Sequence, residues 1–553
     1  MGDEPNTGRD QPAARGRDWA QLLSLAFVGL GLLLRAIQYF ADRSQWTDET
    51  MLSTNIVDRS LHQLMTGPLT LGQSAPLGFL AVEKLLTLLM GPSDMALRLF
   101  PFIATLAGLV AFHFLTGRVL QRWSQPLAVA LFALAAPLIS YAGQVKQYAS
   151  DVAIVLLLLL MALPIQQRGL TRRQAGWAAA AGFVAAWFSQ GAVLTLAGLS
   201  VVLLWGAWRQ RRSGLPEFGL QRVLPVAAIW MIGGLAASAV AWLKMSPAMR
   251  DYLHRFWSPG FMPRPLWSMA ALQWPVRALG ALFGRGSSAS LNYLVPPFYV
   301  VLSLVGLFLL ARRIRARAAL VLSPLVVTFA AAVLHQYPFY DRLILFLVPI
   351  FLLGLAEAIG CLVGLAQRRV GPVLGGAVLL LGLPLAYPVA ASPPPYGSEN
   401  IKPVLRYLRE HRQAGDPVYV YHGTIPAFEY YAPRLGFGPA GETIIGPCHR
   451  GNTRLYLGEL DRFRGQRRVW LLFAHSVSLY DERGDILRYL DAIGARREQY
   501  LAPSRGPART DPAHLDTADT YLYDLSDPAR LALASAATFP LRTFALNERL
   551  GCN

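Results

Sequence analysis

Two adjacent carboxylates near the start of the chain have the residue types that acid–base chemistry needs. Asp48 and Glu49 follow Trp46 just after a long apolar stretch. A carboxylate beside a membrane lies in a reduced dielectric, which raises its basicity and suits it to take a proton from a hydroxyl group. Two solvated charges in a loop would give the same sequence, so the residues alone leave both interpretations open.

Two further segments combine cations with aromatic residues. Residues 144–151 and 335–342 each join two apolar stretches, and both fall on the same side of the membrane as the acidic pair. Arginine, with its planar fork, and lysine, as a point charge, are suited to hold a phosphate or pyrophosphate group. Snorkelling of long side chains at a membrane surface is the alternative. The candidate substrate-binding residues here are Lys146, Tyr148, Tyr337, Tyr340 and Arg342.

A third aromatic segment lies in a long loop after the seventh apolar stretch. Arg255 and Trp257 stand in the sequence Tyr-Leu-His-Arg-Phe-Trp at residues 252–257. An aromatic belt that anchors an interfacial helix explains such a segment. A cover over a lipid-linked substrate is the functional alternative, and it makes Arg255 and Trp257 candidate substrate-binding residues.

The elements that must position these residues are membrane helices. The chain has 553 residues, of which 54% are hydrophobic and only 15% charged, whereas about a quarter of the residues in soluble domains are charged. One water-soluble core cannot absorb so much apolar sequence. The net charge of +18 is concentrated in arginines between apolar runs, which is a topology signal and excludes nucleic acid as the expected partner.

We predict eleven membrane spans from the apolar runs. They are residues 19–39, 96–117, 126–142, 149–165, 176–189, 191–208, 223–243, 290–311, 318–334, 343–364 and 371–391. With this count, every short arginine-rich loop lies on the side of the N-terminus, which makes the N-terminus cytoplasmic and the C-terminus extracytoplasmic.

The orientation depends on residues 76–90, which we predict not to cross. This stretch is shorter than the ~20 residues of a span, and it carries Glu83 and Lys84 in its middle. An amphipathic helix along the outer interface fits it better. If it crossed, every later basic loop would move to the outer side.

The chain after the proline-rich linker at residues 392–397 has the pattern of a small soluble α/β domain. Residues 417–421 and 469–473 alternate or run apolar like strands, and residues 427–432 and 486–493 have a helical pattern. No G-x-G-x-x-G or Walker A motif indicates a nucleotide. The predicted organisation is a cytoplasmic tail at 1–18, a transmembrane domain at 19–391 with outer loops at 40–95 and 244–289, and an extracytoplasmic α/β domain at 392–553.

Cysteines and acidic residues bound the cofactor chemistry. Cys361 lies in an apolar run, and a disulfide between Cys448 and Cys552 is open. No Cys/His spacing indicates a zinc site. Two acidic residues without a third ligand do not specify a metal site, so a divalent metal is possible and no cofactor is required.

These motifs together resemble a known family. The acidic pair after Trp46 resembles the membrane glycosyltransferases of the GT-C fold, in particular the protein O-mannosyltransferase and aminoarabinose-transferase branch, which is glycosyltransferase family 39. Residues 74–79 and 91–99 look like that family's proline-led interfacial helix, Gly-Pro turn and Arg-Leu start of the next span, with Ala75 in place of the first of two prolines. Residues 337–349 are similar to its late loop. The resemblance covers roughly residues 19–365 in order and spacing.

The resemblance implies a transferase of the cell envelope, placed in the bacterial inner membrane as a multi-pass protein. Its donor would be a sugar linked to polyprenyl phosphate, and its acceptor a hydroxyl of a lipid, glycan or protein on the outer face. Asp48 would be the general base and Glu49 would position the acceptor or the base. Lys146 and Arg342 would hold the departing lipid phosphate.

Two other classes of membrane protein fit the same composition. A transporter or lipid flippase also has many spans with polar residues at helix ends. The spans show no obvious internal repeat, however, and the candidate charges gather at the membrane surface rather than at its middle. A noncatalytic assembly subunit, which binds a partner through the C-terminal domain, is the third hypothesis.

Overall fold

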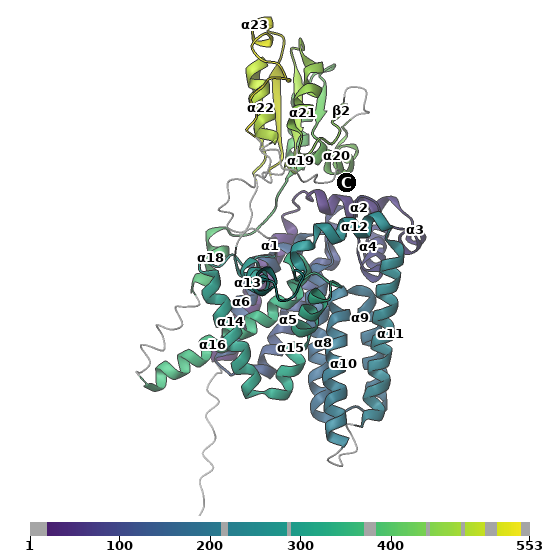
Figure 1. The fold of residues 1–553 in the computed structure, drawn as a ribbon, viewed down its shortest axis with the longest axis vertical. Helices are drawn as coiled ribbons and strands as arrows, with labels where there is room; N and C mark the ends of the chain where they lie inside the picture. Colours follow the sequence, from purple (N-terminus) through teal and green to yellow (C-terminus); the bar gives the residue numbers. More distant parts are fainter. Residues whose placement is uncertain are drawn as a thin grey trace, which may run out of the picture.

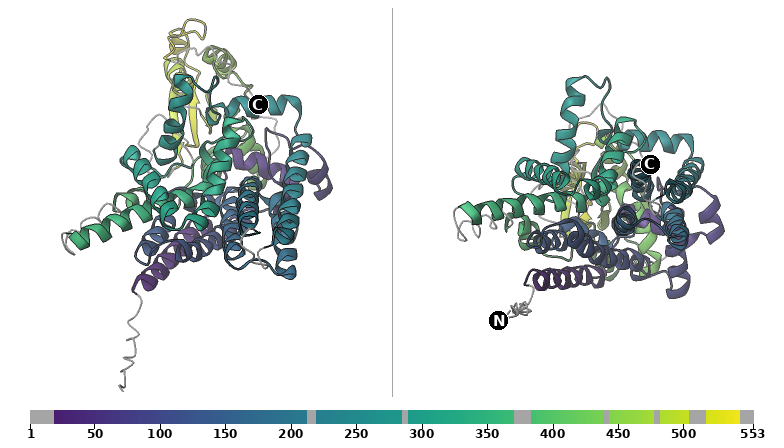
Figure 2. Two further views of the ribbon diagram at one scale, coloured as in Figure 1. Left: turned by 60° about the horizontal axis from the view of Figure 1, so that its bottom comes forward. Right: turned by 90° about the horizontal axis from the view of Figure 1, so that it is seen from below.

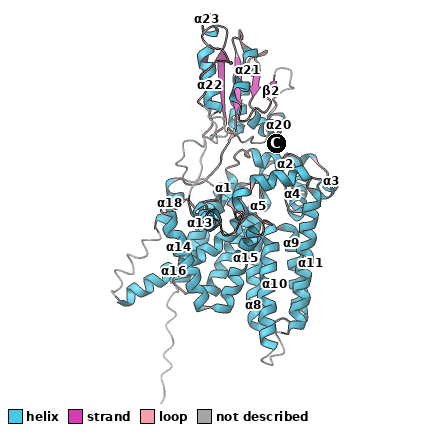
Figure 3. Ribbon diagram, in the orientation of Figure 1, coloured by secondary structure: helices cyan, strands magenta, loops and turns pink. Residues whose placement is uncertain are grey.

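The computed structural model describes residues 19–211, 219–284, 289–369, 383–437, 443–476, 482–503 and 517–542. Helices form a bundle, and the strands of the described ranges all lie in the C-terminal part (Figure 3). This arrangement confirms the predicted fold class, a polytopic helical bundle with a small α/β part after it.

The helices of the bundle follow one another with short connections. Up to the first broken span they are α1 (Trp19–Phe40), α2 (Thr47–Asp58), α3 (Leu61–Thr66), α4 (Leu77–Met90), α5 (Asp94–Val119), α6 (Ser124–Ala133) and α7 (Ala136–Ser140). The next are α8 (Tyr148–Arg168), α9 (Arg172–Phe188), α10 (Gln190–Arg211), α11 (Leu220–Lys244), α12 (Pro247–Phe256) and α13 (Met269–Phe283). The last are α14 (Pro296–Arg313), α15 (Arg315–Val333), the 3₁₀ helix η3 (Asp341–Leu347), α16 (Val348–Arg369) and α18 (Leu383–Ala391).

Eight helices of the described ranges are long and apolar enough to cross a membrane, and nine if a bent pair counts as one span. The chain is therefore a multi-pass membrane protein. Two of the eleven predicted spans are not among these nine. The span predicted at residues 176–189 is α9, which has only 17 residues. The span predicted at 371–391 lies largely outside the described residues, with α18 at its end.

The predicted span at residues 126–142 is broken into α6 and α7, which meet at an angle of 54°. Pro137 stands in the first turn of α7, where its missing N–H is tolerated. The fully buried Arg35 donates hydrogen bonds to the carbonyls of Phe132 and Ala133 at the break, at 3.2 Å each. A guanidinium thus satisfies carbonyl groups that the broken helix leaves without intrahelical partners.

Helix α4 corresponds to the stretch that we predicted not to cross. It has 14 residues and is not among the candidate spans of the described ranges. Glu83 and Lys84 are both buried, and Lys84 Nζ donates to the carbonyls of Ile56 and Val57 at 3.0 Å each. Lys84 therefore ties α4 to the end of α2, the helix that carries the acidic pair.

The helices α8 to α11 form one side of the bundle, and α14 to α16 pack beside them (Figure 2). Small residues allow some of these helices to approach closely. A Cβ placed on Gly306 of α14 would lie 1.8 Å from the carbonyl oxygen of Gly354 in α16. Close backbone approach through glycine is typical of helix packing in membranes.

The C-terminal part contains a five-stranded sheet in the order β2-β1-β3-β5-β4. Its strands are β1 (Val418–Val420), β2 (Thr443–Ile445), β3 (Val469–Phe473), β4 (Ala495–Leu501) and β5 (Asp519–Asp524). Strand β1 pairs in parallel with β2 and β3, whereas β5 pairs antiparallel with β3 and β4. The carboxyl ends of β1, β2 and β3 therefore share one edge of the sheet.

Helices cover both faces of this sheet. They are α19 (Ile401–His411) and α20 (Ile425–Tyr431) on one face, α21 (Thr453–Leu460) and α22 (Glu482–Ile493) on the other, and the short α23 (Pro528–Leu531). Val418 and Val420 pack with α19 and α20, while the intervening Tyr419 packs with α21 and α22. Successive side chains of a strand point to opposite faces, which explains the division.

The α/β part stands on one end of the bundle, beside α2 and α12 (Figure 1). A single apolar cluster joins Leu52 and Ile56 of α2 to Ala427 and Phe428 of α20. The domain is therefore packed on the helix that carries the acidic pair. We call this end of the bundle the domain end.

The disulfide hypothesis is only partly accessible. Cys361 in α16 is a free thiol and Cys448 is disulfide-bonded. Cys552, the partner considered from the sequence, lies outside the described residues.

Candidate active site

The acidic pair lies in the first turn of α2 at the domain end. The backbone N–H of Trp46 donates to the Glu49 carboxylate at 3.3 Å, so a residue of the first turn closes the start of its own helix. Asp48 lies between these two residues, and its side chain is 18% exposed. The helix start thus fixes where the Asp48 carboxylate can lie.

Three segments distant in sequence meet at Asp48. Its Oδ2 lies 3.2 Å from Lys146 Nζ and 2.9 Å from an Arg342 guanidinium nitrogen. Gln73 Nε2 donates to Asp48 Oδ1 at 2.9 Å, and Lys146 Nζ donates to Gln73 Oε1 at 2.7 Å. One carboxylate therefore holds two cations together, and Gln73 bridges the carboxylate to one of them.

The two cations keep Asp48 ionised. Burial by itself would raise the pKa of the Asp48 carboxyl, but Lys146, Arg342 and the hydrogen bond from Gln73 together hold that pKa well below its ordinary value. A carboxylate stabilised in this way is a weak base while both cations contact it. A ligand that draws the cations away would make it a stronger base.

Three aromatic rings surround the Arg342 guanidinium. Its central carbon lies 5.5 Å from the ring centroid of Trp46, 5.9 Å from that of Tyr148 and 5.2 Å from that of Trp257. Such contacts hold a cation by the negative face of the ring. Arg342 Nε is nevertheless buried without a hydrogen-bond partner among the described residues, so the guanidinium keeps a donor for a ligand.

These side chains border a cavity of about 1380 Å³. Asp48, Gln73, Lys146, Tyr148, Trp257 and Arg342 line its polar part. The rest of the wall is largely apolar and comes from α9, α10 and α11. Its residues include Trp187, Val193, Leu194, Leu235, Ala239 and Trp242.

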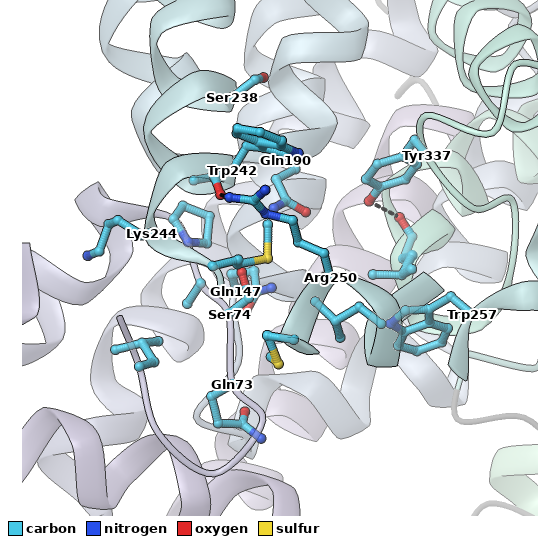
Figure 4. A pocket seen from close by; sticks show the side chains of 18 of the residues that line it. Gln73, Ser74, Gln147, Gln190, Ser238, Trp242, Lys244, Arg250, Trp257 and Tyr337 are labelled. Carbon is cyan, nitrogen blue, oxygen red and sulfur yellow. Dashed lines mark hydrogen bonds between the residues drawn. The ribbon is translucent and has the colours of Figure 1, made fainter. Parts of the chain in front are cut away.

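Figure 4 shows how the cavity is enclosed. Trp242 and Lys244 of α11 lie on one side, and Trp257 and Tyr337 lie across from them. Arg250 of α12 projects between the two sides and donates to the Trp242 carbonyl at 2.8 Å. Helix α12 therefore covers part of the cavity, as the cover hypothesis for the 252–257 segment expected.

The structure brings together six of the nine predicted site residues. Asp48, Lys146, Tyr148, Tyr337, Arg342 and Trp257 all line the cavity. Glu49, Tyr340 and Arg255 are not among the lining residues.

The three outlying residues have other surroundings. The Glu49 carboxylate is buried, lies 3.5 Å from Arg98, and accepts the Val145 N–H at 2.7 Å. It therefore ties α2 to the segment that precedes Lys146. Tyr340 packs where the chain runs past Gly260, and Arg255 is exposed.

Several lining residues were not predicted as site residues. Gln73 is the most important, because it contacts both Asp48 and Lys146. Gln147 also lines the cavity, and its Oε1 is buried without a partner among the described residues. The other unpredicted polar residues that line it are Gln190, Lys244, Arg250, Tyr252, His254 and His335.

The carboxylates do not form a metal site in this geometry. No group of three or more His, Cys, Asp or Glu side chains in the described ranges could hold a metal ion. Asp48 contacts two cations, and Glu49 is turned to Arg98. The acidic pair therefore does not present two carboxylates to one ion.

The chain matches solved structures over most of its length. A crystal structure of ArnT from Cupriavidus metallidurans bound to undecaprenyl phosphate is 12% identical, with coverage of 91% of this chain and 98% of that one and a TM-score of 0.44. A crystal structure of the same protein in the apo state is 14% identical over 94% of this chain and 99% of that one, with a TM-score of 0.34. ArnT is an aminoarabinose transferase of the GT-C fold, the branch that the sequence resembles. No protein-family model and no curated protein matches the chain.

Proposed function

We propose that this protein is a membrane glycosyltransferase that moves a sugar from a polyprenyl-phosphate-linked donor to a hydroxyl group of an acceptor. The observation that carries the proposal is the meeting of Asp48, Lys146 and Arg342 at the polar part of a large cavity with apolar walls. One carboxylate and two cations are the groups that such a transfer requires, and the cavity suits a substrate with one charged and one apolar part.

The donor would bind with its phosphate at Lys146 and Arg342. Arg342 offers a guanidinium fork with an unpaired Nε, and Lys146 offers a buried ammonium group. Charge-assisted bonds from these groups are suited to a phosphate. The prenyl chain would lie along the walls of α9, α10 and α11, where Trp187, Val193 and Leu235 line the cavity.

The same groups support the chemical step. The acceptor oxygen attacks the anomeric carbon, the bond from this carbon to the phosphate oxygen breaks, and its electron pair stays on the phosphate. Lys146 and Arg342 stabilise the negative charge that develops there. The acceptor hydroxyl gives its proton to Asp48, so the products are the glycosylated acceptor and polyprenyl phosphate.

The donor itself would prepare the base. In the unliganded site both cations contact Asp48 and lower its pKa. A phosphate that shares Lys146 and Arg342 weakens their contact with Asp48, and the pKa of Asp48 then rises. Asp48 becomes a better base when the donor is in place.

Replacing Asp48 by asparagine tests the proposal. The Asp48→Asn variant keeps the shape but lacks the basic carboxylate, so transfer should fall by about 10²- to 10⁴-fold. The assay incubates the purified protein with lipid-linked sugar extracted from its own host's membranes and measures release of sugar that depends on an added hydroxyl acceptor. Glu49→Gln is the matched comparison and should lose less, because Glu49 does not line the cavity.

Other outcomes separate the rival hypotheses. Undiminished sugar release by Asp48→Asn would remove Asp48 from the chemistry. Movement of lipid-linked sugar across a vesicle membrane without its cleavage would indicate a flippase. A wild-type protein that does neither would support a noncatalytic subunit.

A further inference from the structure

A carboxylate of the C-terminal part contacts the helix that carries Asp48. Glu399 Oε2 accepts two hydrogen bonds from Thr47, one from its backbone N–H and one from its Oγ1, each at 2.8 Å. Thr47 is the first residue of α2 and the direct neighbour of Asp48. Glu399 lies 352 positions further along the chain.

Helix α2 lacks a side-chain cap of its own for this N–H. Trp46 is the N-cap residue and makes no side-chain capping bond. The first N–H groups of a helix have no intrahelical acceptor, and they carry the positive end of the helix dipole. Glu399 supplies both an acceptor and a negative charge at this position, as an aspartate at the N-cap would do.

The position of Glu399 is itself fixed. The residue is almost fully buried, and its φ of +52° lies in the left-handed region, which a non-glycine residue adopts only when the surroundings hold it there. Glu399 Oε1 lies 2.7 Å from Nδ1 of His475, in the loop that follows β3. Burial by itself would raise the pKa of Glu399, but His475 and the bonds from Thr47 lower it, so the carboxylate is ionised.

A second contact joins the same two parts. Thr47 Oγ1 lies 3.5 Å from the carbonyl oxygen of Gly423, in the loop that follows β1. The loops at the carboxyl ends of β1 and β3 therefore both meet the first turn of α2. Asp48 in that turn must lie within about 3 Å of both Lys146 and Arg342 to hold them together.

We propose that Glu399, braced by His475, is a positioning residue for Asp48: it fixes the first turn of α2 so that the Asp48 carboxylate stays between Lys146 and Arg342. The inference rests on the proposed function for its effect on transfer. It makes the C-terminal domain part of the active-site architecture and not only a separate module.

The test compares Glu399→Ala with a matched break of the same interface. Lys402→Met is the control, because Lys402 Nζ bonds Asp94 at 2.8 Å and Asp42 at 3.2 Å without touching α2. We expect Glu399→Ala to lower kcat for sugar release by about 10- to 100-fold, the cost of a small misplacement of a reacting group. The KM for the lipid-linked sugar should stay close to that of wild type, and Lys402→Met should retain wild-type kcat.

Hydrogen exchange gives a readout that does not depend on transfer. In Glu399→Ala, a peptide that covers residues 46–52 should exchange faster than in wild type, because the Thr47 N–H loses its acceptor. Glu399→Gln keeps an oxygen that can accept this bond, so it should restore most of the protection and most of kcat. His475→Ala should have a smaller effect that disappears in the Glu399→Ala background, since His475 acts through Glu399.

The outcomes separate the two proposals. Equal kcat and equal exchange in Glu399→Ala and Lys402→Met would overturn the positioning role. Faster exchange with unchanged kcat would also overturn it, because the first turn would then be free to move without consequence. A wild-type protein that releases no sugar would count against the proposed function, while the exchange result would still decide whether Glu399 holds α2.

Discussion

At the scale of single residues, Asp48 has two relations to the same cations. In the unliganded site it is their counter-ion, and in the proposed reaction it is a base that must give them up to a phosphate. The headgroup therefore competes with Asp48 for Lys146 and Arg342. This competition has a consequence that a simple substrate-binding site would not show.

Asp48→Asn should bind polyprenyl phosphate more tightly than wild type although it transfers poorly. The variant leaves two buried cations without their carboxylate, and a phosphate then relieves that cost instead of competing. We expect affinity for a polyprenyl monophosphate in detergent to rise about tenfold, which corresponds to about 1.4 kcal/mol. Thermophoresis or calorimetry with the purified protein measures it. Asp58→Asn, an exposed carboxylate at the other end of α2, should leave the affinity unchanged, and weaker binding by Asp48→Asn would contradict the competition.

Stability should follow the same charges. The pKa of Asp48 is lowered in the folded protein, so its ion pairs stabilise the fold above the ordinary carboxyl pKa. This stabilisation persists as pH falls through that ordinary value and is lost only at lower pH. Asp48 is therefore ionised, and pairs with both cations, throughout the neutral range.

The sequence indicated these residues but not their geometry. Asp48, Lys146 and Arg342 were recognisable because charged residues beside apolar stretches are costly and rare. Gln73 carried no such signal, since a glutamine in a loop fits any surface. Glu49 follows Asp48 directly, but successive residues of a helix point about 100° apart, so one carboxylate meets the cavity and the other meets Arg98.

At the scale of elements, the apolar wall of the cavity depends on small residues of α11. Ala239 lines the cavity beside Leu235 and Trp242. If the prenyl chain lies there, a large side chain at this position must exclude it. The size of the donor chain then decides how much binding is lost.

Ala239→Trp should weaken binding of a long polyprenyl phosphate and spare a short one. The indole would fill space that the distal prenyl units need, while the phosphate site at Lys146 is untouched. We expect at least a tenfold loss of affinity for a long chain, about 1.4 kcal/mol, and little change for geranyl phosphate. Ala228→Trp is the control, because Ala228 is exposed on the same helix and does not line the cavity. Equal losses for both chain lengths would place the prenyl chain elsewhere.

Elements were predictable where composition and length agreed. The stretch at residues 76–90 was too short and too charged to cross, and α4 is a 14-residue helix. The break between α6 and α7 was not foreseen, because residues 126–142 are apolar throughout and only Pro137 marks the bend. In the C-terminal domain β1 and β3 were predicted, but β4 was missed because its sequence Ala-Arg-Arg-Glu-Gln-Tyr-Leu is that of a charged outer strand of the sheet.

At the scale of the whole molecule, the two ends of the bundle differ in charge and in partners. The domain end holds Asp48, Lys146 and Arg342 beneath the α/β part. Arginines gather at the ends of other helices, where Arg313 donates to the carbonyl of Val119 at 2.7 Å and Arg317 to that of Arg118 at 3.0 Å. Contacts between the ends of α5, α14 and α15 therefore place a basic surface away from the candidate active site.

This asymmetry gives the orientation that we predict. Short loops rich in arginine remain in the cytoplasm because the positive-inside rule acts on such loops. A reporter that is active only outside the cytoplasm should therefore be active when fused after Ala391 and inactive when fused near Arg212 or Arg315. A cytoplasmic reporter at the same three positions should give the opposite pattern. A cytoplasmic signal after Ala391 would mean that the parity is wrong and that residues 76–90 cross the membrane after all. Asp48 and the two cations would then need a donor presented from another side, so the orientation decides which face of the membrane supplies the acceptor.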